Sequence, residues 1–328
     1  MASEAATLET RPDLRVRIGP LELKNPVTVA SGTYGYGTEY AEFHDPGRLG
    51  AIFLKGLTLE PRGGNAPQRL VETPSGLMNA IGLQNVGLEE FIRYKLPAIE
   101  GLTTLCIANI CGSTMEEYVT LAERLSAIAR VDAIELNISC PNVKSGCIAF
   151  GSDPRMTEEV TRRVVRATDR PVIVKLSPNV TSIAEMARAA EAGGAAGLAV
   201  VNTFLALAID VKTRRPKLGN VTGGLSGPAI RPIAVRMVWD AYQAVRIPII
   251  GQGGITCARD ALEFFIAGAS AISIGTQNFV DPLAPITVLE GIEQYLIENG
   301  MARLSELVGS LQIPEEAPAA IRTGGARE

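Results

Sequence analysis

The middle of the chain carries a cysteine and two asparagines directly after an apolar segment. Residues 133–138 form a run that predicts a buried strand, and Pro141 ends it because proline has no backbone N–H to donate. Cys140 stands at this strand end, between Asn137 and Asn142. Strand ends of this kind lie at the mouth of a sheet or barrel, where reactants can reach them. The pattern predicts a reaction site here.

Cys140 is the leading candidate for a general base, if the reaction needs one. A thiol, with an ordinary pKa of about 8.5, can accept a proton near neutral pH when its surroundings lower that pKa. Most isolated cysteines are inert and buried, which we expect of Cys106 and Cys257. The only histidine, His44, stands in a polar stretch and is expected in a surface loop. Histidine triads and histidine-rich metal sites are therefore excluded.

Lysines and asparagines recur at other predicted strand ends. Lys55 follows one apolar run and Lys175 lies within another, although burying an unpaired ammonium is costly. One such lysine could reach the rim through its flexible stem, whereas two at one mouth favour a bound anion or an electron-rich ring. Asn79, Asn109 and Asn202 offer both donors and acceptors, which suits a polar heterocycle. Any single one could equally be a turn residue.

Two glycine-bearing strand ends follow each other late in the chain. Gly253 and Gly254 end one of them, and Gly275 with Thr276 ends the next. Backbone N–H groups without side chains around them can cradle a phosphate at such loops. Either motif alone could be only a tight turn. Together, they predict a phosphate site.

Short apolar runs alternate with amphipathic segments, which predicts parallel strands covered by helices. Eight such units close naturally into a (β/α)8 TIM barrel, an α/β fold. A doubly wound open sheet is the alternative, but no GxGxxG motif opens the first helix. The predicted strands are residues 27–30, 51–54, 105–109, 133–138, 172–176, 198–202, 247–251 and 271–275. The predicted helices are residues 115–129, 157–168, 182–192, 230–245 and 258–267.

Other segments surround this barrel. Residues 16–18 and 21–23 predict an N-terminal β-hairpin that closes the barrel floor. Two insertions follow strands and are therefore expected as walls of the catalytic face. We expect residues 13–312 to form the barrel domain, and residues 1–12 and 313–328 to be flexible tails. The two insertions are residues 56–104 and 203–229.

The composition is that of an ordinary soluble chain. Its 328 residues are 46% hydrophobic and carry a net charge of −4. The absence of a basic cluster argues against nucleic acid as a partner. No stretch approaches the roughly 20 apolar residues of a membrane span, so we expect no membrane contact and a cytoplasmic location. Five cysteines without a CxxC pair suggest neither a metal site nor a disulfide framework.

Several motifs together resemble those of dihydroorotate dehydrogenases, in the family's order and from about residue 14 to 305. Cysteine rather than serine as the base is typical of class 1, the soluble branch. Residues 63–67 and 79–85 resemble class 1B, the catalytic subunit of an NAD-linked enzyme. The motifs that carry the resemblance are residues 55–56 with 61–62, 79–85, 137–142, 223–228, 253–254 and 274–276.

The resemblance implies an FMN at the barrel mouth, with its phosphate on the two glycine-bearing strand ends. The resemblance places Lys175 beside the pyrimidine edge of the ring, where a cation would stabilise the reduced, anionic flavin. The implied FMN contacts are Ala30, Ser31, Lys55, Gly56, Asn109, Asn137, Lys175, Val201, Gly227, Gly253, Gly254, Gly275 and Thr276.

The implied reaction is the oxidation of (S)-dihydroorotate to orotate in pyrimidine (UMP) biosynthesis. Cys140 would take a proton from ring carbon 5 while FMN accepts hydride from carbon 6. Lys55 would favour the negative charge of the substrate. The implied substrate contacts are Lys55, Asn79, Ala80, Ile81, Gly82, Leu83, Asn137, Asn142, Asn202 and Thr203.

Class 1B further implies a partner subunit with an iron–sulfur cluster and FAD that passes electrons to NAD. This chain has no four-cysteine run of its own for such a cluster. The resemblance also implies a homodimer core, hence a heterotetramer with the partner. Three alternatives stay open: a class 1A-like enzyme that reduces fumarate, an enzyme acting on uracil-type bases, and a non-catalytic barrel that binds a phosphorylated ligand.

Overall fold

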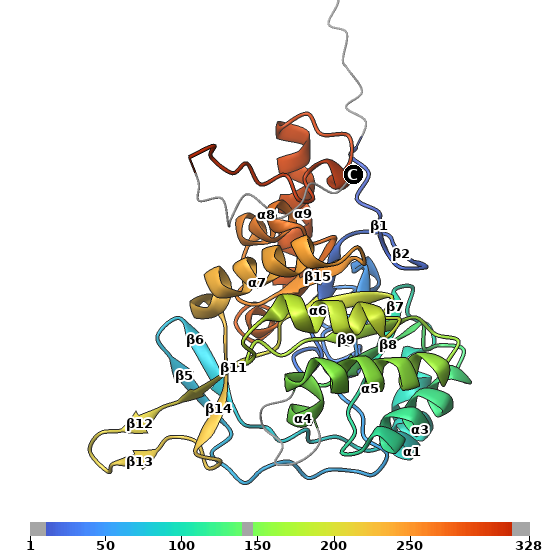
Figure 1. Cartoon of the computed structure of the whole chain (residues 1–328), viewed down its shortest axis with the longest axis vertical. Coiled ribbons are helices and arrows are strands. Elements are labelled where there is room, and N and C mark those ends of the chain that lie inside the picture. Colours follow the sequence, from blue (N-terminus) through green and yellow to red (C-terminus); the bar gives the residue numbers. More distant parts are fainter. Residues whose placement is uncertain (1–10, 140–146, 317–328) are drawn as a thin grey trace, which may run out of the picture.

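Eight parallel strands close into a barrel in the computed structural model, which describes residues 11–139 and 147–316 (Figure 1). The order around the barrel is β10-β15-β16-β3-β4-β7-β8-β9. All eight predicted strands are confirmed, with ends within two residues of the expected ones. They are β3 (Val27–Val29), β4 (Ala51–Phe53), β7 (Leu105–Ile110), β8 (Ala133–Asn137), β9 (Val172–Lys175), β10 (Gly197–Val200), β15 (Ile249–Gln252) and β16 (Ala271–Ile274).

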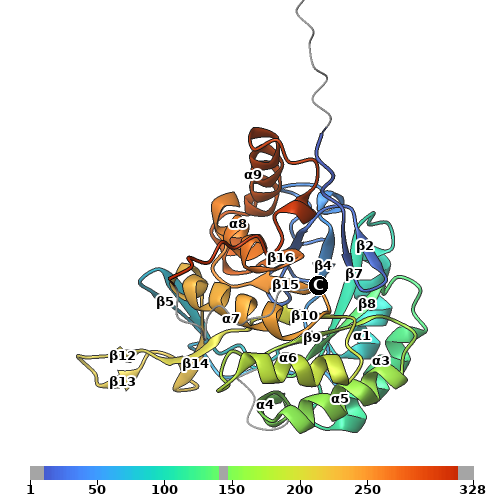
Figure 2. The ribbon, with the colours of Figure 1, turned by 45° about the horizontal axis from the view of Figure 1, so that its top comes forward.

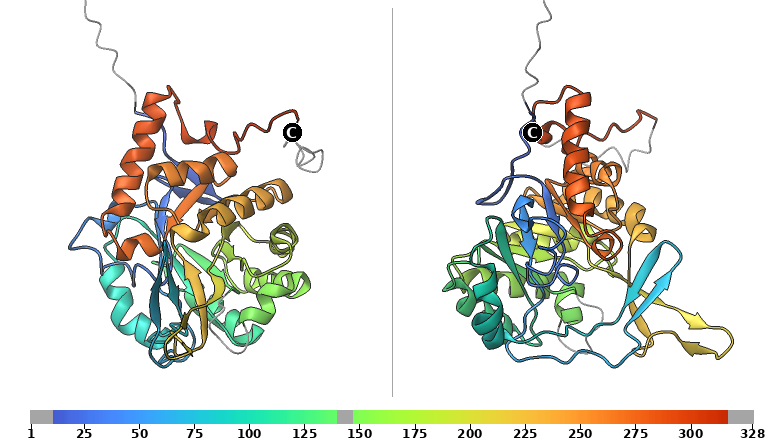
Figure 3. Two further views of the ribbon diagram at one scale, coloured as in Figure 1. Left: turned by 90° about the vertical axis from the view of Figure 1, so that its left-hand side faces the viewer. Right: turned by 180° about the vertical axis from the view of Figure 1, so that it is seen from behind.

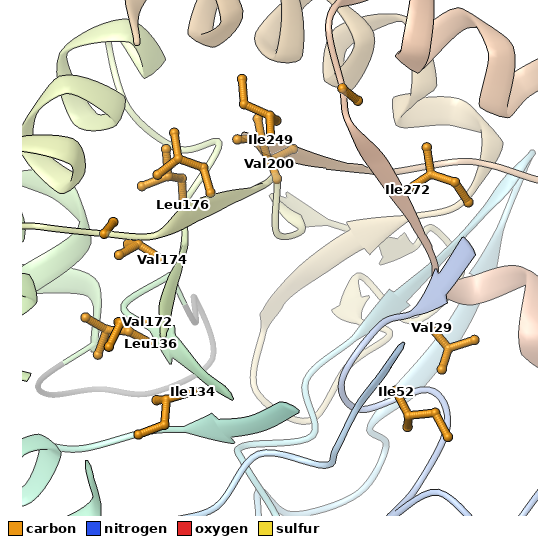
Figure 4. Close-up of a cluster of buried hydrophobic side chains, with 14 of the residues drawn as sticks. Val29, Ile52, Ile134, Leu136, Val172, Val174, Leu176, Val200, Ile249 and Ile272 are labelled. Carbon is orange, nitrogen blue, oxygen red and sulfur yellow. The ribbon is translucent and has the colours of Figure 1, made fainter. Parts of the chain in front are cut away.

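The strands are mostly apolar because both of their faces are buried. Alternate side chains such as Ile134 and Leu136 point outward and pack with the helices. Figure 4 shows this outward-facing layer around the barrel. The side chains between them, such as Ala133 and Ile173, fill the barrel interior.

The helices cover the outside of the barrel (Figures 1 and 3). Side chains cap several of them: Thr114 and Ser182 each accept a hydrogen bond from the backbone N–H three residues later. The five predicted helices are confirmed, and α9 was not predicted. The longer helices are α3 (Met115–Ser126), α5 (Pro154–Arg166), α6 (Ile183–Ala192), α7 (Arg231–Ala244), α8 (Ala258–Ala267) and α9 (Ala284–Glu298).

Shorter helical turns lie in the connections. Three α-helical turns are α1 (Leu88–Glu90), α2 (Leu96–Ile99) and α4 (Cys147–Ser152), and η2 (Phe91–Lys95) is a π-helical turn. The 3-10 turns are η1 (Pro46–Arg48), η3 (Pro228–Ile230), η4 (Thr276–Phe279) and η5 (Leu304–Glu306). Among the described helices, none has the length and apolarity that a bilayer crossing needs.

The N-terminal hairpin consists of β1 (Val16–Ile18) and β2 (Leu21–Leu23) and lies where the sequence predicts it. Ile18 and Leu23 are fully buried and pack against the interior side chains of the barrel. The hairpin therefore closes the floor of the barrel, at the end away from the insertions (Figure 1).

The two insertions join in one sheet, which was not predicted. Strands β5 (Leu70–Thr73) and β6 (Gly76–Asn79) come from the first insertion, and β11 (Phe204–Leu207) and β14 (Thr222–Ser226) from the second. They pair in the order β11-β14-β6-β5. A further hairpin of β12 (Ile209–Asp210) and β13 (Arg215–Pro216) projects from this sheet away from the barrel (Figure 2). The insertions thus build a wall over the carboxyl ends of the barrel strands.

Candidate active site

A cavity of about 370 Å³ lies at the carboxyl ends of the barrel strands, under the insertion sheet. Most of the residues expected from the sequence meet in its lining, although they come from eight strand ends and two insertions. The predicted residues that line it are Ala30, Ser31, Lys55, Gly56, Asn79, Ile81, Gly82, Leu83, Asn109, Asn137, Lys175, Val201, Asn202, Thr203, Gly227, Gly253, Gly254, Gly275 and Thr276.

Three predicted residues are not found in this lining. The Ala80 side chain is 1% exposed and packs with Met78 and Leu218 within the insertion sheet. Its expected substrate contact could therefore come only from its backbone. Cys140 and Asn142 lie outside the described residues, so the assignment of Cys140 as the base stays a prediction.

The sequence did not single out several residues that also line the cavity. Gln252 and Ser273 are polar side chains on buried strands, a signal that was available in the sequence. Phe279 gave no such signal, because an apolar residue after a strand is ordinary. The lining residues not predicted are Gly32, Thr33, Leu70, Leu77, Gln84, Ser226, Ile230, Gln252, Ile255, Thr256, Ser273 and Phe279.

Lys55 and Lys175 are the only charged side chains among the described lining residues. Burial lowers the pKa of Lys55, an effect that the nearby Glu39 opposes. The Lys175 side chain is 6% exposed, and its Nζ lies 3.9 Å from Oε1 of Glu135. The only charged groups in the described lining are thus cationic, although Glu135 behind it offsets Lys175, and this lining suits an anionic ligand.

A chain of hydrogen bonds connects the polar residues on one side of the cavity. Asn109 donates to the buried carboxylate of Glu135, and Nδ2 of Asn137 donates to Oδ1 of Asn109 over 3.3 Å. Oδ1 of Asn137 accepts from the hydroxyl of Ser139 at 3.1 Å, and Nδ2 of Asn202 donates to that hydroxyl at 2.8 Å. These side chains are thus held in defined orientations.

The glycines beside the cavity form a backbone cradle. Gly227, Gly253 and Gly254 have φ values of 93°, 131° and 75°, a region that favours glycine. A Cβ on Gly254 would lie 2.7 Å from the carbonyl oxygen of Gly227. A Cβ on Gly275 would meet no atom closer than 3.7 Å, so the backbone there is open to a ligand. These glycines line the cavity as the sequence predicts, and their assignment as a phosphate site stays a prediction.

One expectation outside the cavity is wrong: Cys257 is exposed at the start of α8, not buried. His44 lies in a loop, as expected, and is half-buried. Its Nε2 lies 3.1 Å from the hydroxyl of the buried Tyr34, and burial lowers its pKa. Cys106 is buried as expected, and burial raises its pKa to about 12. These three residues are not part of the cavity lining.

Comparisons with known proteins show the family to which this chain belongs. A family profile described as dihydroorotate dehydrogenase matches residues 13–296. A relative from Desulforamulus reducens is 56% identical over 301 residues, which are 92% of this chain and 99% of the relative. Relatives from Geotalea uraniireducens and Geotalea daltonii are 54% and 53% identical, with the same shares covered. All three are named dihydroorotate dehydrogenase B (NAD(+)), catalytic subunit. This chain belongs to the dihydroorotate dehydrogenase family of oxidoreductases.

Proposed function

We propose that this chain oxidises (S)-dihydroorotate to orotate in UMP biosynthesis, as the FMN-containing catalytic subunit of an NAD-linked enzyme. The observation that carries the proposal is the lining of the cavity. Among the lining residues that the structure describes, the two lysines are the only charged ones, and several others are asparagines or glutamines. Dihydroorotate is a small carboxylate with a ring of alternating carbonyl and N–H groups. Such an acid needs a cation and a set of amides, and both are present.

The residues present fit an FMN. The cradle consists of Gly253, Gly254 and Gly275, which have no side chains of their own to cover their backbone N–H groups, and of Thr276 beside them, a combination that suits a phosphate. Oγ1 of Thr276 donates to Oγ of Ser226 over 2.7 Å, which fixes this edge of the cavity. Bound FMN supplies the hydride acceptor. Its ring would be held by the cavity-lining residues Ala30, Ser31, Lys55, Gly56, Asn109, Asn137, Lys175, Val201 and Gly227.

The substrate would lie between the ring and the insertion sheet. The partly buried ammonium of Lys55 would pair with its negative charge, which counters the desolvation that lowers the lysine pKa. Asn137 and Asn202 already share the hydroxyl of Ser139 as a hydrogen-bonding partner, so little freedom is lost when substrate binds. The other proposed substrate contacts are Asn79, Ile81, Gly82, Leu83, Thr203, Asn142 and the backbone of Ala80.

Cys140 is proposed as the base that removes the proton from ring carbon 5. Ser139, which directly precedes it, is 2% exposed and is fixed by Asn137 and Asn202. This anchoring would hold the backbone on which the base stands, and an oriented base contributes about 10²–10⁴ in rate.

Substitution of the proposed base tests this function. Cys140→Ala should bind FMN as the wild type does, yet its flavin should be reduced by dihydroorotate at least about a hundredfold more slowly. Cys257→Ala removes an exposed thiol at the start of α8 and is the matched control, which should react at the wild-type rate. Equal rates in the two variants would remove Cys140 from the mechanism.

The names of the relatives imply a second subunit, and we propose that it carries an iron–sulfur cluster and FAD and passes the electrons to NAD. A surface suited to it lies beside the cavity: Phe279, Val280 and Leu283 are 56%, 74% and 47% exposed, and Phe279 also lines the cavity. The neighbouring loop is tied to this surface, because the hydroxyl of Tyr40 donates to the carbonyl oxygen of Asn278 at 3.2 Å. A partner seated there would reach the edge of the flavin site.

We also propose that two copies of this chain form the core of a heterotetramer. A hairpin projects from the molecule (Figure 3). This hairpin and the strand before it expose four apolar residues, Leu205, Leu207, Ile209 and Val211, at 54%, 51%, 54% and 85%. Exposed apolar side chains grouped on a projecting arm are typical of an interface. We propose that this arm and the surface of Phe279, Val280 and Leu283 form separate contacts in one assembly.

A further inference from the structure

A glutamate lies buried inside the barrel, directly below the cavity. Glu135 is 1% exposed and is in the middle of β8, with Ala133 on its floor side and Asn137 on its cavity side. Ala133 belongs to the interior core of the barrel, whereas Ile134 and Leu136 belong to the outer layer. Because side chains alternate along a strand, Glu135 points into the barrel interior.

Both oxygens of this carboxylate face residues that line the cavity, although Glu135 itself does not line it. Oε2 accepts a hydrogen bond from Nδ2 of Asn109, and Oε1 lies 3.9 Å from Nζ of Lys175. The pairing follows from the sheet register, since Asn109 lies opposite Glu135 on β7, and Lys175 lies opposite Asn137 on β9. Glu135 therefore contacts two of the proposed flavin-binding residues, Asn109 and Lys175, from the side away from the cavity.

The carboxylate also gives the neighbouring hydrogen-bond chain its direction. An ionised carboxylate can only accept, so Asn109 must turn its NH2 group toward Glu135 and its oxygen toward Asn137. Asn137 then donates to Asn109 and keeps its own oxygen for Ser139. The buried carboxylate of Glu135 thus determines in which direction the NH2 group and the oxygen of each of these two amides point.

We propose that Glu135 is a positioning residue, which sets the net charge beside the flavin ring through Lys175 and the orientation of the substrate-facing amides through Asn109. This inference rests on the function proposed above, because it assigns the effect to bound flavin and to orotate. Stability alone is a weak reason for the pair, since well-packed apolar residues often replace a buried ion pair at no cost.

The substitution Glu135→Gln tests the charge effect with almost no change of shape. It leaves the cation of Lys175 without its counter-charge, and a positive charge near the ring favours the more negative, reduced state of the cofactor. The flavin midpoint potential, measured at pH 6.5 without substrate, should rise by about 30 mV, a tenfold shift in the two-electron equilibrium. Because glutamine can also donate, Asn109 loses its fixed orientation, and the Kd of orotate should rise about tenfold.

Two further variants separate positioning from folding. Glu135→Asp keeps the charge and should return the potential toward the wild-type value. Thr28→Val removes another fully buried polar group on a barrel strand, a hydroxyl that donates to the carbonyl oxygen of Ile272, and it should change neither potential nor orotate binding. Thermal unfolding followed on all three variants shows whether they fold.

The outcomes are distinguishable. A higher potential and weaker orotate binding in Glu135→Gln, with recovery in Glu135→Asp, support the inference. A potential at or below that of the wild type, or the same change in Thr28→Val, overturns it while leaving the proposed function intact. If Glu135→Gln does not fold, Glu135→Asp decides: a potential near the wild-type value supports the inference, and a potential that shifts although the charge is kept overturns it. A wild-type protein that binds no flavin overturns the proposed function and this inference together.

Discussion

The side-chain amide of Asn202 donates a hydrogen bond to the hydroxyl of Ser139 over 2.8 Å. Asn202 follows β10 and Ser139 follows β8, so the bond joins two strand ends that are not neighbours in the barrel. It fixes the residue directly before Cys140 and one of the proposed substrate amides at once.

Ser139→Ala should therefore weaken substrate binding without loss of flavin. The variant removes the hydroxyl that joins Asn137 to Asn202, and each neutral hydrogen bond contributes about 0.5–1.5 kcal/mol. We expect the KM for dihydroorotate to rise about tenfold. Ser126→Ala, whose hydroxyl accepts from the backbone of Asp169 far from the cavity, is the control. An unchanged KM in Ser139→Ala would contradict the positioning role of this bond.

Gly254→Ala should lose its flavin. Its φ of 75° is strained for alanine, and the new Cβ would lie 2.7 Å from the carbonyl oxygen of Gly227. Gly300→Ala carries the same kind of strain at φ 64° but has no atom within 4 Å of the new Cβ. Both variants should lose about 1 kcal/mol of stability from the backbone strain. Only Gly254→Ala should purify colourless, as measured by flavin absorbance, and a yellow Gly254→Ala would place the phosphate elsewhere.

Orotate binding should weaken as pH rises, because burial lowers the pKa of Lys55. A lysine with a lowered pKa is fully protonated only below that value, so the cation that pairs with the carboxylate is lost as pH passes through it. We expect the Kd of orotate to be about tenfold higher at pH 10 than at pH 7, followed by the change in flavin absorbance. In Lys55→Arg the charge persists and the rise should vanish. If the Kd of orotate rises equally in Lys55→Arg, a group other than Lys55 causes the pH dependence.

Val280→Asp should uncouple the chain from its partner subunit. The substitution places a charge on an exposed apolar contact surface, where it would be desolvated. NAD reduction in the presence of the partner should fall about tenfold, while reduction of the flavin by dihydroorotate stays at the wild-type rate. Val211→Asp, at another exposed valine on the projecting arm, should leave NAD reduction unchanged. If Val211→Asp lowers NAD reduction and Val280→Asp does not, the partner subunit binds at the projecting arm instead.

The same two variants test the second interface. Val211→Asp should convert a dimer of this chain into a monomer at micromolar concentration, as measured by light scattering, because a charge replaces an apolar contact. Val280→Asp should remain dimeric. A dimer that survives Val211→Asp would exclude the arm as the contact between copies.

The barrel and its cavity could be predicted because their signals are local. Each strand is a short apolar run, and parallel strands bring their carboxyl ends to one face, so residues such as Lys55 and Asn202 meet without any knowledge of long-range contacts. The hairpin at the floor could also be predicted, because Gly19 and Pro20 separate two short segments in the sequence. In the structure Gly19 lies in the turn between the two strands at φ 57°.

The rest depends on pairings that the sequence does not show. Met78 of β6 pairs with Leu225 of β14, and nothing in the sequence of either insertion indicates a partner so far along the chain. Glu135 was missed because one acidic residue in an apolar run can point inward or outward, and only the register shows it facing Asn109.

Anaerobic mixing of the purified wild-type protein with dihydroorotate, without any partner subunit, tests the proposed chemistry most directly. We predict that the yellow flavin absorbance bleaches within the mixing experiment and that one orotate forms for each flavin reduced. A flavin that stays oxidised, or a protein that holds no flavin after FMN is added, would contradict it.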